Sequence, residues 1–245
     1  MGIVTAVVSG KGGTGKTSVC AGIAGCLAAE GQRVLCIDMD MGLRNLDISL
    51  GMRETAALPF TAVMRGEYAP LDAARHPQIE NLFLLTAPVN EAPEELDAEA
   101  FGGMLQTLRT QYDWVLLDAP AGVGAGFRLA AQFADRVLVV SNGDPASLRD
   151  AGRVAELLFH DDGAEIRLVV NRVSPKLFRK MRATVDDVMD SVGLPLLAVI
   201  PEDENVMLAA AENTALALYS AKGASRACLH AARRLCGRKM PLLMF

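Results

Sequence analysis

The stretch Gly10-Lys11-Gly12-Gly13-Thr14-Gly15-Lys16-Thr17-Ser18 decides how this chain folds. An apolar run over Ile3–Val8 precedes it, and a run of small residues at helical spacing over Val19–Ala29 follows it. We therefore predict a strand, a glycine-rich turn and a helix, which is the setting in which Gly-x-x-x-x-Gly-Lys-Thr binds phosphate. Glycine lets consecutive backbone N–H groups converge on an anion, because no Cβ atom stands in the way.

The same stretch supplies three further features that a phosphate-binding site needs. The positive end of the following helix attracts an anion. The ammonium of Lys16 suits the β- and γ-phosphates, and the hydroxyl of Thr17 suits Mg²⁺. A glycine-rich turn that binds nothing is the alternative, and such a chance match is expected in roughly one chain of this length in a hundred. We adopt nucleotide binding, with the rest of the loop formed by Gly10, Gly12, Gly13, Thr14, Gly15 and Ser18.

Lys11 is the second lysine of this loop. It lies too far around the loop to duplicate Lys16, so we expect its charge to point away from its own nucleotide. The run from Lys11 to Thr17 resembles the deviant Walker A motif of the MinD/ParA ATPases. In that family two subunits enclose two nucleotides face to face, so the resemblance implies an ATP-dependent homodimer in which Lys11 reaches the partner's phosphates. By analogy with arginine fingers, such a cation raises the rate about 10³- to 10⁵-fold. A solvated loop lysine is the alternative.

Two aspartates close the next strand-like run. Arg33–Ile37 leads into Asp38-Met39-Asp40, which places both carboxylates at the edge where open α/β sheets bind ligands. The continuation Met41–Asp47 resembles switch I of MinD proteins. That resemblance implies that Asp40 orients the attacking water and that Asp38 supports Lys16 or the Mg²⁺ shell. Alternatively, the two aspartates cap the next helix.

Asp113–Asp118 is an apolar strand closed by an acid, which is the form of a Walker B motif. Asp118 would hold the magnesium ion, usually through water. Ala119–Gly122 resembles switch II of the same family, where glycine lets the backbone approach the γ-phosphate. Val123–Phe127 extends the match and favours the MinD proteins over the flagellar-number regulators.

Two later strand-like runs, Ile166–Val170 and Leu196–Ile200, end at polar residues. The resemblance implies that the loops after these strands hold the adenine. An amide offers the donor and the acceptor that a purine edge needs. Taken alone, an asparagine at a strand end is more often a turn residue, but the motif order reverses that preference. The predicted adenine contacts are Asn171, Arg172, Pro201 and Asp203.

Length and composition favour one large core. The chain has 245 residues, 51% of them hydrophobic. One α/β domain is therefore the simplest prediction. Together with the motif order, the family resemblance implies a single three-layer α/β P-loop NTPase domain over residues 1–239, with a mostly parallel sheet flanked by helices, and a short apolar tail over 240–245. No apolar run is long enough to span a bilayer, and the five cysteines fall in apolar runs without a Cys-x-x-Cys pair. We expect buried thiols in a reduced, cytoplasmic compartment.

Charge is distributed unevenly. The net charge of −5 argues against a globally basic nucleic-acid binder, and we expect no sequence-specific nucleic-acid binding. Residues 213–245, however, carry cations and no carboxylate, and residues 172–182 also contain basic residues without an acid. Each basic segment is either a solvated surface or part of a surface that faces an anion.

The carboxyl-terminal residues depart from the family pattern. MinD proteins usually continue into an amphipathic helix that binds the bilayer when ATP is bound. Met240–Phe245, interrupted by Pro241, cannot form the several turns that such a helix needs. Four explanations of this departure remain open. The chain is truncated, it attaches to the membrane through a partner, Met240–Phe245 acts as a weak interfacial tag flanked by Arg238 and Lys239, or the apolar tail packs on its own domain.

The resemblance implies an ATPase (ATP and water to ADP and phosphate) that dimerises on ATP and regulates septum placement in cell division. Its implied partners are a MinC-like septum inhibitor, a MinE-like or other activator, and a peripheral membrane contact. The alternatives are a ParA-like ATPase that positions DNA or cargo, a flagellar-number regulator and a nucleotide-dependent scaffold that does not hydrolyse ATP.

Overall fold

The computed structural model describes residues 1–41, 43–89, 91–159, 163–181 and 184–242. Its strands form one sheet and are β1 (Ile3–Val8), β2 (Val34–Asp38), β3 (Ala74–Arg75), β4 (Leu82–Leu85), β5 (Trp114–Asp118), β6 (Arg136–Asn142), β7 (Glu165–Val173) and β8 (Leu196–Pro201).

The helices connect these strands. They are α1 (Lys16–Ala29), α2 (Leu46–Leu50), α3 (Phe60–Met64), α4 (Ala98–Leu108), α5 (Ala125–Gln132), α6 (Pro145–Leu158), α7 (Pro175–Met181), α8 (Val185–Val192), α9 (Asn205–Ala211), α10 (Leu216–Tyr219) and α11 (Gly223–Leu235), with short 3₁₀ turns η1 (Pro70–Asp72) and η2 (Pro93–Glu95).

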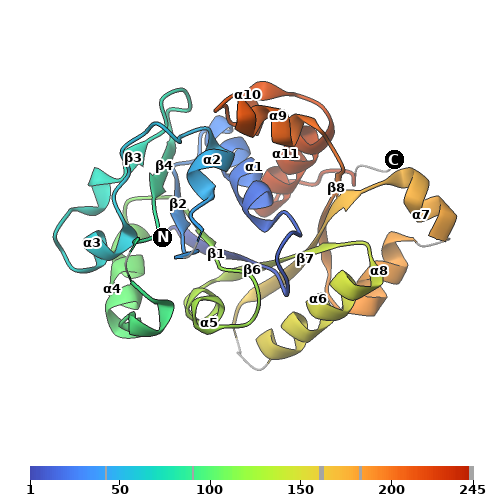
Figure 1. Ribbon diagram of the computed structural model, residues 1–245, viewed down its shortest axis with the longest axis horizontal. Coiled ribbons are helices and arrows are strands. Elements are labelled where there is room, and N and C mark those ends of the chain that lie inside the picture. The colour runs from blue at the N-terminus through green and yellow to red at the C-terminus, as the bar shows by residue number, and fades with distance from the viewer. Residues whose placement is uncertain (42, 90, 160–162, 182–183, 243–245) are drawn as a thin grey trace.

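The strand order is β3-β4-β2-β5-β1-β6-β7-β8, and every neighbouring pair is parallel except β3 with β4. Helices cover both faces of the sheet: α1, α2, α9, α10 and α11 lie on one side, and α4, α5, α6 and α8 lie on the other (Figure 1). This arrangement confirms the predicted three-layer fold with a mostly parallel sheet.

Successive side chains of the central strands pack into two hydrophobic clusters, one on each face of the sheet. In β5, Val115 and Leu117 pack into one hydrophobic cluster, whereas Trp114 and Leu116 pack into the other. Successive side chains of a strand point to opposite faces, so a strand that is apolar throughout is buried on both sides. The carboxyl ends of all the parallel strands consequently meet at one edge.

The structure differs from the sequence-based expectation at three places. Helix α1 begins at Lys16 instead of Val19, because the loop turns directly into the helix after Gly15, whose φ is +82°. Strand β7 continues through Asn171 and Arg172, and its register with β8 shifts between Val170 and Val173. Cys236 is exposed just beyond α11, whereas the other four cysteines are buried as expected.

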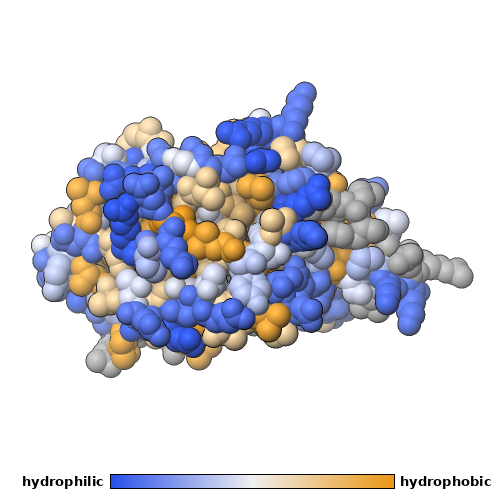
Figure 2. All heavy atoms as spheres, turned by 90° about the horizontal axis from the view of Figure 1, so that it is seen from above, coloured by the Kyte–Doolittle hydropathy of each residue, from blue (hydrophilic) through white to orange (hydrophobic). Residues whose placement is uncertain are grey.

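Helices α9 and α10 also present apolar side chains outward. Met207, Leu208 and Leu218 are exposed. Figure 2, which views the molecule from above, shows hydrophobic residues near the centre of this face, surrounded by hydrophilic ones. Within the described residues, no helix is both long and apolar enough to traverse a lipid bilayer.

The described part of the carboxyl-terminal tail follows α11 and is tied to it through the backbone. Arg234 donates from Nε and Nη2 to the carbonyl oxygen of Met240, and Nδ1 of His230 lies 3.1 Å from the carbonyl oxygen of Pro241. Leu242 remains exposed, and residues 243–245 lie outside the described part of the chain. Met240 and Pro241 of the tail are therefore held against their own domain.

Candidate nucleotide-binding site

The predicted site residues gather at the carboxyl edge of three adjacent strands. The glycine-rich loop follows β1, Asp38 ends β2, and Asp118 ends β5. In the sheet register, Asp118 stands beside Val7 on one side and beside Asp38 on the other. The pairing of the strands therefore places the buried Asp118 carboxylate between the strand that leads into the loop and the buried carboxylate of Asp38.

The loop backbone is shaped for close approach. Gly13 and Gly15 have φ values of +83° and +82°, and a Cβ atom on Gly15 would lie 2.3 Å from Nδ2 of Asn171. The hydroxyl of Thr14 is buried and has no hydrogen-bond partner among the described residues. A loop with left-handed glycines, an unpartnered hydroxyl and a helix N-terminus behind it fits a polyphosphate.

Lys16 lies inside this site and not at its surface. Its side chain is 6% exposed, and Nζ donates to Oδ1 of Asp118 and lies 3.5 Å from Oγ1 of Thr17. Burial raises the pKa of the Asp118 carboxyl, although hydrogen bonds from Lys16 and Thr17 oppose that rise. One buried cation thus neutralises the Walker B acid and stands next to the hydroxyl predicted to bind Mg²⁺.

Asp38 takes the capping role that the sequence left open as an alternative, and its support of Lys16 or of the Mg²⁺ shell stays a prediction. Its Oδ1 accepts from the backbone N–H of Asp40 at 2.9 Å, and its Oδ2 accepts from the N–H of Leu46 at 3.1 Å. The carboxylate therefore closes the segment that resembles switch I and caps the start of α2. Burial, together with repulsion from Asp118, raises the pKa of Asp38 to about 6.

The Asp38 carboxyl gives a pH-dependent stability that can be measured. Folded protein keeps the proton up to about pH 6, whereas the unfolded chain releases it near 3.8. More protons are bound by the native state in this window, so the contribution of Asp38 to stability falls as pH rises through it. Relative to Asp38→Asn, the free energy of unfolding of the wild type should fall by up to about 3 kcal/mol from pH 4 to pH 7. Urea unfolding at both pH values measures this difference, and an unchanged difference would contradict the assignment.

The residues predicted to bind Mg²⁺ offer oxygen atoms, but they do not form a complete set of ligands without phosphate. The candidate ligands are the Thr17 hydroxyl and the carboxylates of Asp38 and Asp118, which are the oxygen donors that Mg²⁺ prefers. No group of three acidic, histidine or cysteine side chains converges anywhere in the described residues. Because Mg²⁺ is usually held by one or two carboxylates together with substrate phosphates, these residues fit the ion when a nucleotide supplies the remaining oxygens.

Lys11 lies at the outer rim of the loop. Its Nζ is 3.5 Å from Oδ1 of Asp144, which is the N-cap of α6, and the two side chains are 37% and 49% exposed. Hydrogen bonds from Ser147, assisted by Lys11, lower the pKa of Asp144. Lys11 is therefore held by an acid of its own chain, and its direction relative to a bound nucleotide stays a prediction.

The four predicted adenine residues line one small cavity between β7, β8 and α9. Asn171, Arg172, Pro201 and Asp203 all contribute to it, and its volume is about 40 Å³. That is the space of roughly one water molecule. Arg172 lies against the loop beside this cavity, since Nη1 donates to the carbonyl oxygen of Gly13 at 3.2 Å and Nε lies 3.9 Å from Oε2 of Glu202. The cavity would have to widen to admit a purine.

Like Arg172, Asn171 and Asp203 have structural partners. Nδ2 of Asn171 donates to the carbonyl oxygen of Thr14 at 2.8 Å, so the amide ties β7 to the loop. The carboxylate of Asp203 accepts from the N–H groups of Asn205 and Ala224, at the starts of α9 and α11. Asp203 therefore shapes the cavity by joining two helices, and its role toward adenine stays a prediction.

Sequence reasoning did not find Asp144 or Glu202 as partners of Lys11 and Arg172. Both acids lie in loops at strand ends, and nothing in the local pattern distinguishes them from helix-capping residues. Arg172 has a positive φ of 55°, which is uncommon outside glycine and aims its side chain back at the loop. One feature of the sequence could have indicated these partners. Both acids follow closely after a strand, and the carboxyl ends of parallel strands lie at the same edge of the sheet as the loop.

Comparison with known proteins agrees with this geometry. A family model described as the CobQ/CobB/MinD/ParA nucleotide binding domain matches residues 5–216. The septum site-determining protein MinD of Synechocystis is 33% identical over 249 residues, covering 100% of this chain and 93% of the relative. The structure also resembles a chain of the MinC:MinD cell division protein complex of Aquifex aeolicus, with a TM-score of 0.90 and 32% identity over 99% of each chain. MinD of Pyrococcus horikoshii complexed with Mg-ADP gives a TM-score of 0.83 and 29% identity over 96% of each chain. The chain therefore belongs to the MinD/ParA family of nucleotide-binding ATPases, in its MinD branch.

Proposed function

We propose that this chain is an ATP-driven switch that dimerises on ATP and regulates where the division septum forms. MinD-type regulation of septum placement is the function of the relatives that match its whole length. ATP hydrolysis dissolves the dimer, so the nucleotide sets the time for which a partner can stay bound. A MinC-like septum inhibitor, a MinE-like activator and a peripheral membrane contact are the partners that we assign to it.

The observation that carries this proposal is the different environment of the two loop lysines. Lys16 is buried against Asp118, whereas Lys11 is held at the rim by one exposed ion pair with Asp144. Exposed pairs contribute only about 0 to 1 kcal/mol. A partner's triphosphate, which carries several negative charges, can therefore displace Asp144 from Lys11 at little cost.

The residues of the site divide the work between them. Loop N–H groups and Lys16 hold the β- and γ-phosphates, while Thr17 and Asp118 provide oxygens for Mg²⁺, which would offset negative charge on the transferring phosphoryl group. Asp40 stands beside the two buried carboxylates and raises the pKa of both. We assign it to the attacking water, which a carboxylate orients by accepting its hydrogen bond.

Asp40→Ala tests hydrolysis apart from binding. We expect the variant to bind ATP and to dimerise, but to release phosphate roughly 10²- to 10⁴-fold more slowly, because the water is no longer oriented. Phosphate release in the presence of anionic lipid and activator measures the rate, and light scattering measures the mass. Asp190→Ala, at an exposed acid of α8, is the matched control and should behave like the wild type.

Two outcomes of that experiment would count against the proposal. A monomer in saturating ATP would mean that Asp40 contributes to dimerisation. Absence of phosphate release from the wild type, even with lipid and activator, would favour the scaffold that does not hydrolyse ATP.

The ParA-like alternative is distinguished by the surface that the ATP-bound dimer recognises. Duplex DNA and anionic liposomes should be titrated separately with Asp40→Ala in ATP, since this variant remains in the dimeric state. Binding to liposomes or to a MinC-like inhibitor supports the MinD assignment. DNA binding that weakens steeply with salt, without liposome binding, would favour ParA, because phosphate contacts release counterions.

A further inference from the structure

The Lys16 ammonium contacts two oxygen atoms that the site offers to a metal ion. Its Nζ donates to Oδ1 of Asp118 and lies 3.5 Å from Oγ1 of Thr17. Thr17 and Asp118 are residues predicted to hold Mg²⁺, directly or through water. One protein cation therefore lies against the oxygens that a divalent cation would use.

Carboxylates gather around this ammonium. Asp118 ends β5 and Asp38 ends the neighbouring strand β2, so the two acids are paired in the sheet register. The backbone N–H of Asp40 donates to Asp38 at 2.9 Å, which places a third acidic residue beside them. Like charges this close repel one another unless a positive charge lies among them. The site therefore retains a cation, which is either the ammonium or a metal ion.

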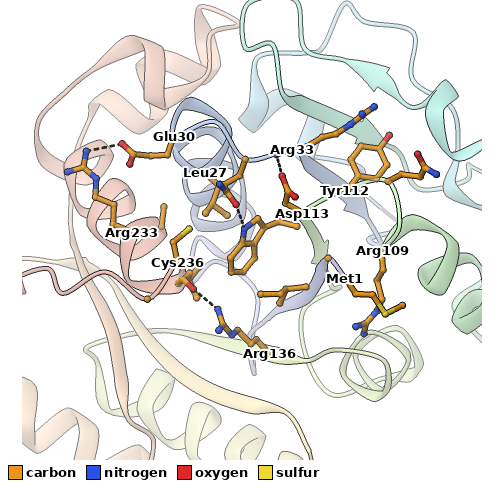
Figure 3. Close-up of a pocket in the computed structure, with 18 of the residues that line it drawn as sticks. Met1, Leu27, Glu30, Arg33, Arg109, Tyr112, Asp113, Arg136, Arg233 and Cys236 are labelled. Atoms are coloured by element: carbon orange, nitrogen blue, oxygen red, sulfur yellow. Dashed lines mark hydrogen bonds and ion pairs between the residues drawn. The ribbon is translucent and has the colours of Figure 1, made fainter.

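Burial distinguishes this ion pair from an ordinary one. The side chains of Lys16 and Asp118 are 6% and 1% exposed. Figure 3 shows a contrasting pair at the opposite edge of the sheet, where Glu30 and Arg233 meet beside a hollow and are 21% and 32% exposed. Water can replace a partner in an exposed pair, whereas a buried carboxylate needs a positive charge next to it. Asp118 therefore releases the ammonium only when another positive charge takes its place.

The ammonium has a second set of acceptors within reach when phosphate is bound. The loop before Lys16 is shaped for phosphate by the left-handed Gly13 and Gly15 and by the unpartnered hydroxyl of Thr14. A lysine in this position reaches the β- and γ-phosphates, and its flexible four-carbon stem lets the ammonium turn. Two cations about 4 Å apart repel each other, so the ammonium has to turn before a metal ion can use the oxygen of Asp118.

We propose that the Lys16 ammonium and Mg²⁺ compete for the oxygens of Asp118 and Thr17, so that a metal ion binds only after a nucleotide phosphate has drawn the ammonium away. This inference rests on the nucleotide site of the proposed function and adds an order of binding to it. The nucleotide binds first, Lys16 turns to its phosphates, and the oxygens that Lys16 leaves become available to the metal ion. Because binding is reciprocal, a metal ion held there in turn strengthens nucleotide binding.

Mn²⁺ binding tests this order without hydrolysis or dimerisation. Electron paramagnetic resonance measures free Mn²⁺, so a titration with protein gives the dissociation constant. Wild-type protein without nucleotide should bind Mn²⁺ weakly, and wild-type protein saturated with ADP should bind it at least about tenfold more tightly than a solution of ADP alone. Calorimetric titration of ADP in EDTA should still show binding, because the first step needs no metal ion.

Removal of the ammonium is the decisive comparison. Lys16→Met keeps an unbranched side chain without the charge, so this variant without nucleotide should bind Mn²⁺ roughly tenfold or more tightly than the wild type without nucleotide, because no charge-assisted hydrogen bond has to be broken. Adding Asp118→Asn to it should remove that gain. Lys16→Gln is a second variant in case Lys16→Met is unstable, and it should show a smaller gain because its amide can still donate to Asp118.

Arg233→Gln is the matched control, because it removes a cation from the exposed pair with Glu30 and should bind Mn²⁺ like the wild type. Thermal melting checks that each variant is folded. Mn²⁺ without nucleotide should raise the melting temperature of Lys16→Met more than that of the wild type, since a ligand stabilises the state that it binds.

The outcomes separate this inference from the function on which it rests. Tighter Mn²⁺ binding by the Lys16 variants without nucleotide, lost again with Asp118→Asn, supports competition. Equal Mn²⁺ binding by the wild type and both Lys16 variants without nucleotide overturns it, even if ATP-dependent dimerisation and phosphate release are intact. Failure of the wild type to bind ADP in EDTA overturns the order of binding. Failure to bind ADP with or without Mn²⁺ overturns the nucleotide site as well.

Discussion

Lys16→Ala should abolish ATP binding at micromolar nucleotide. The ammonium is 6% exposed and lies between Asp118 and the loop, so a bound triphosphate would meet it where water is largely excluded. Losing one partner of a buried charge pair costs about 2 to 5 kcal/mol, which corresponds to roughly 30- to 5,000-fold in affinity. Calorimetric titration with ATP and Mg²⁺ measures the loss.

The same substitution should also destabilise the folded protein. Asp118 is buried and would be left without its cation, and breaking a buried ion pair in this way costs about 3 to 5 kcal/mol unless the acid takes up a proton. Lys16→Gln separates the two effects, because its amide can still donate to Asp118. We expect Lys16→Gln to lose ATP binding but to keep more of the wild-type melting temperature. If either variant retained wild-type ATP affinity, the assignment of Lys16 would be wrong.

Lys11→Ala should leave nucleotide binding by the monomer intact and remove ATP-dependent dimerisation. Its side chain points to the rim and pairs with Asp144, so its loss removes no contact inside the monomer's phosphate site. If Lys11 acts on the partner's phosphates as a trans-acting cation does, turnover should fall about 10³- to 10⁵-fold. Light scattering in ATP measures the dimer, and phosphate release measures turnover.

Two matched variants sharpen this test. Lys239→Ala removes an exposed lysine far from the loop in sequence and should dimerise normally. Asp144→Ala removes the acid that holds Lys11 in the monomer, so it should dimerise at least as readily as the wild type. A Lys11→Ala protein that still forms the dimer in ATP would contradict the role of Lys11 across the interface.

Much of the fold could be predicted because its signals are local. A strand, a glycine-rich turn and a helix are specified by residues adjacent in the chain, and Asp38 and Asp118 each end an apolar run. Parallel strands bring their carboxyl ends to one edge, so the presence of these acids near Lys16 follows from the pattern once the sheet is inferred.

Contacts that join distant segments could not be predicted in the same way. Lys11 and Asp144 come together only because β1 and β6 are neighbours in the sheet, which aligns the loops that follow them. The irregular end of β7 turns Arg172 back onto the loop, and this depends on the register of β7 against β8. Neither the neighbour order nor that register is visible in a single run of residues.

The sequence by itself determined the phosphate-binding loop and the acids at the strand ends, because periodicity and turn chemistry act over a few neighbouring residues. The order of its motifs, through the family resemblance, also implied the three-layer fold. Only the tertiary structure decided that Lys16 is neutralised by Asp118 and that Lys11 is held by an acid of its own chain. Those outcomes depend on which strands pair and on which side chains lose water when the sheet and its helices pack, and burial of that kind is a property of the whole fold.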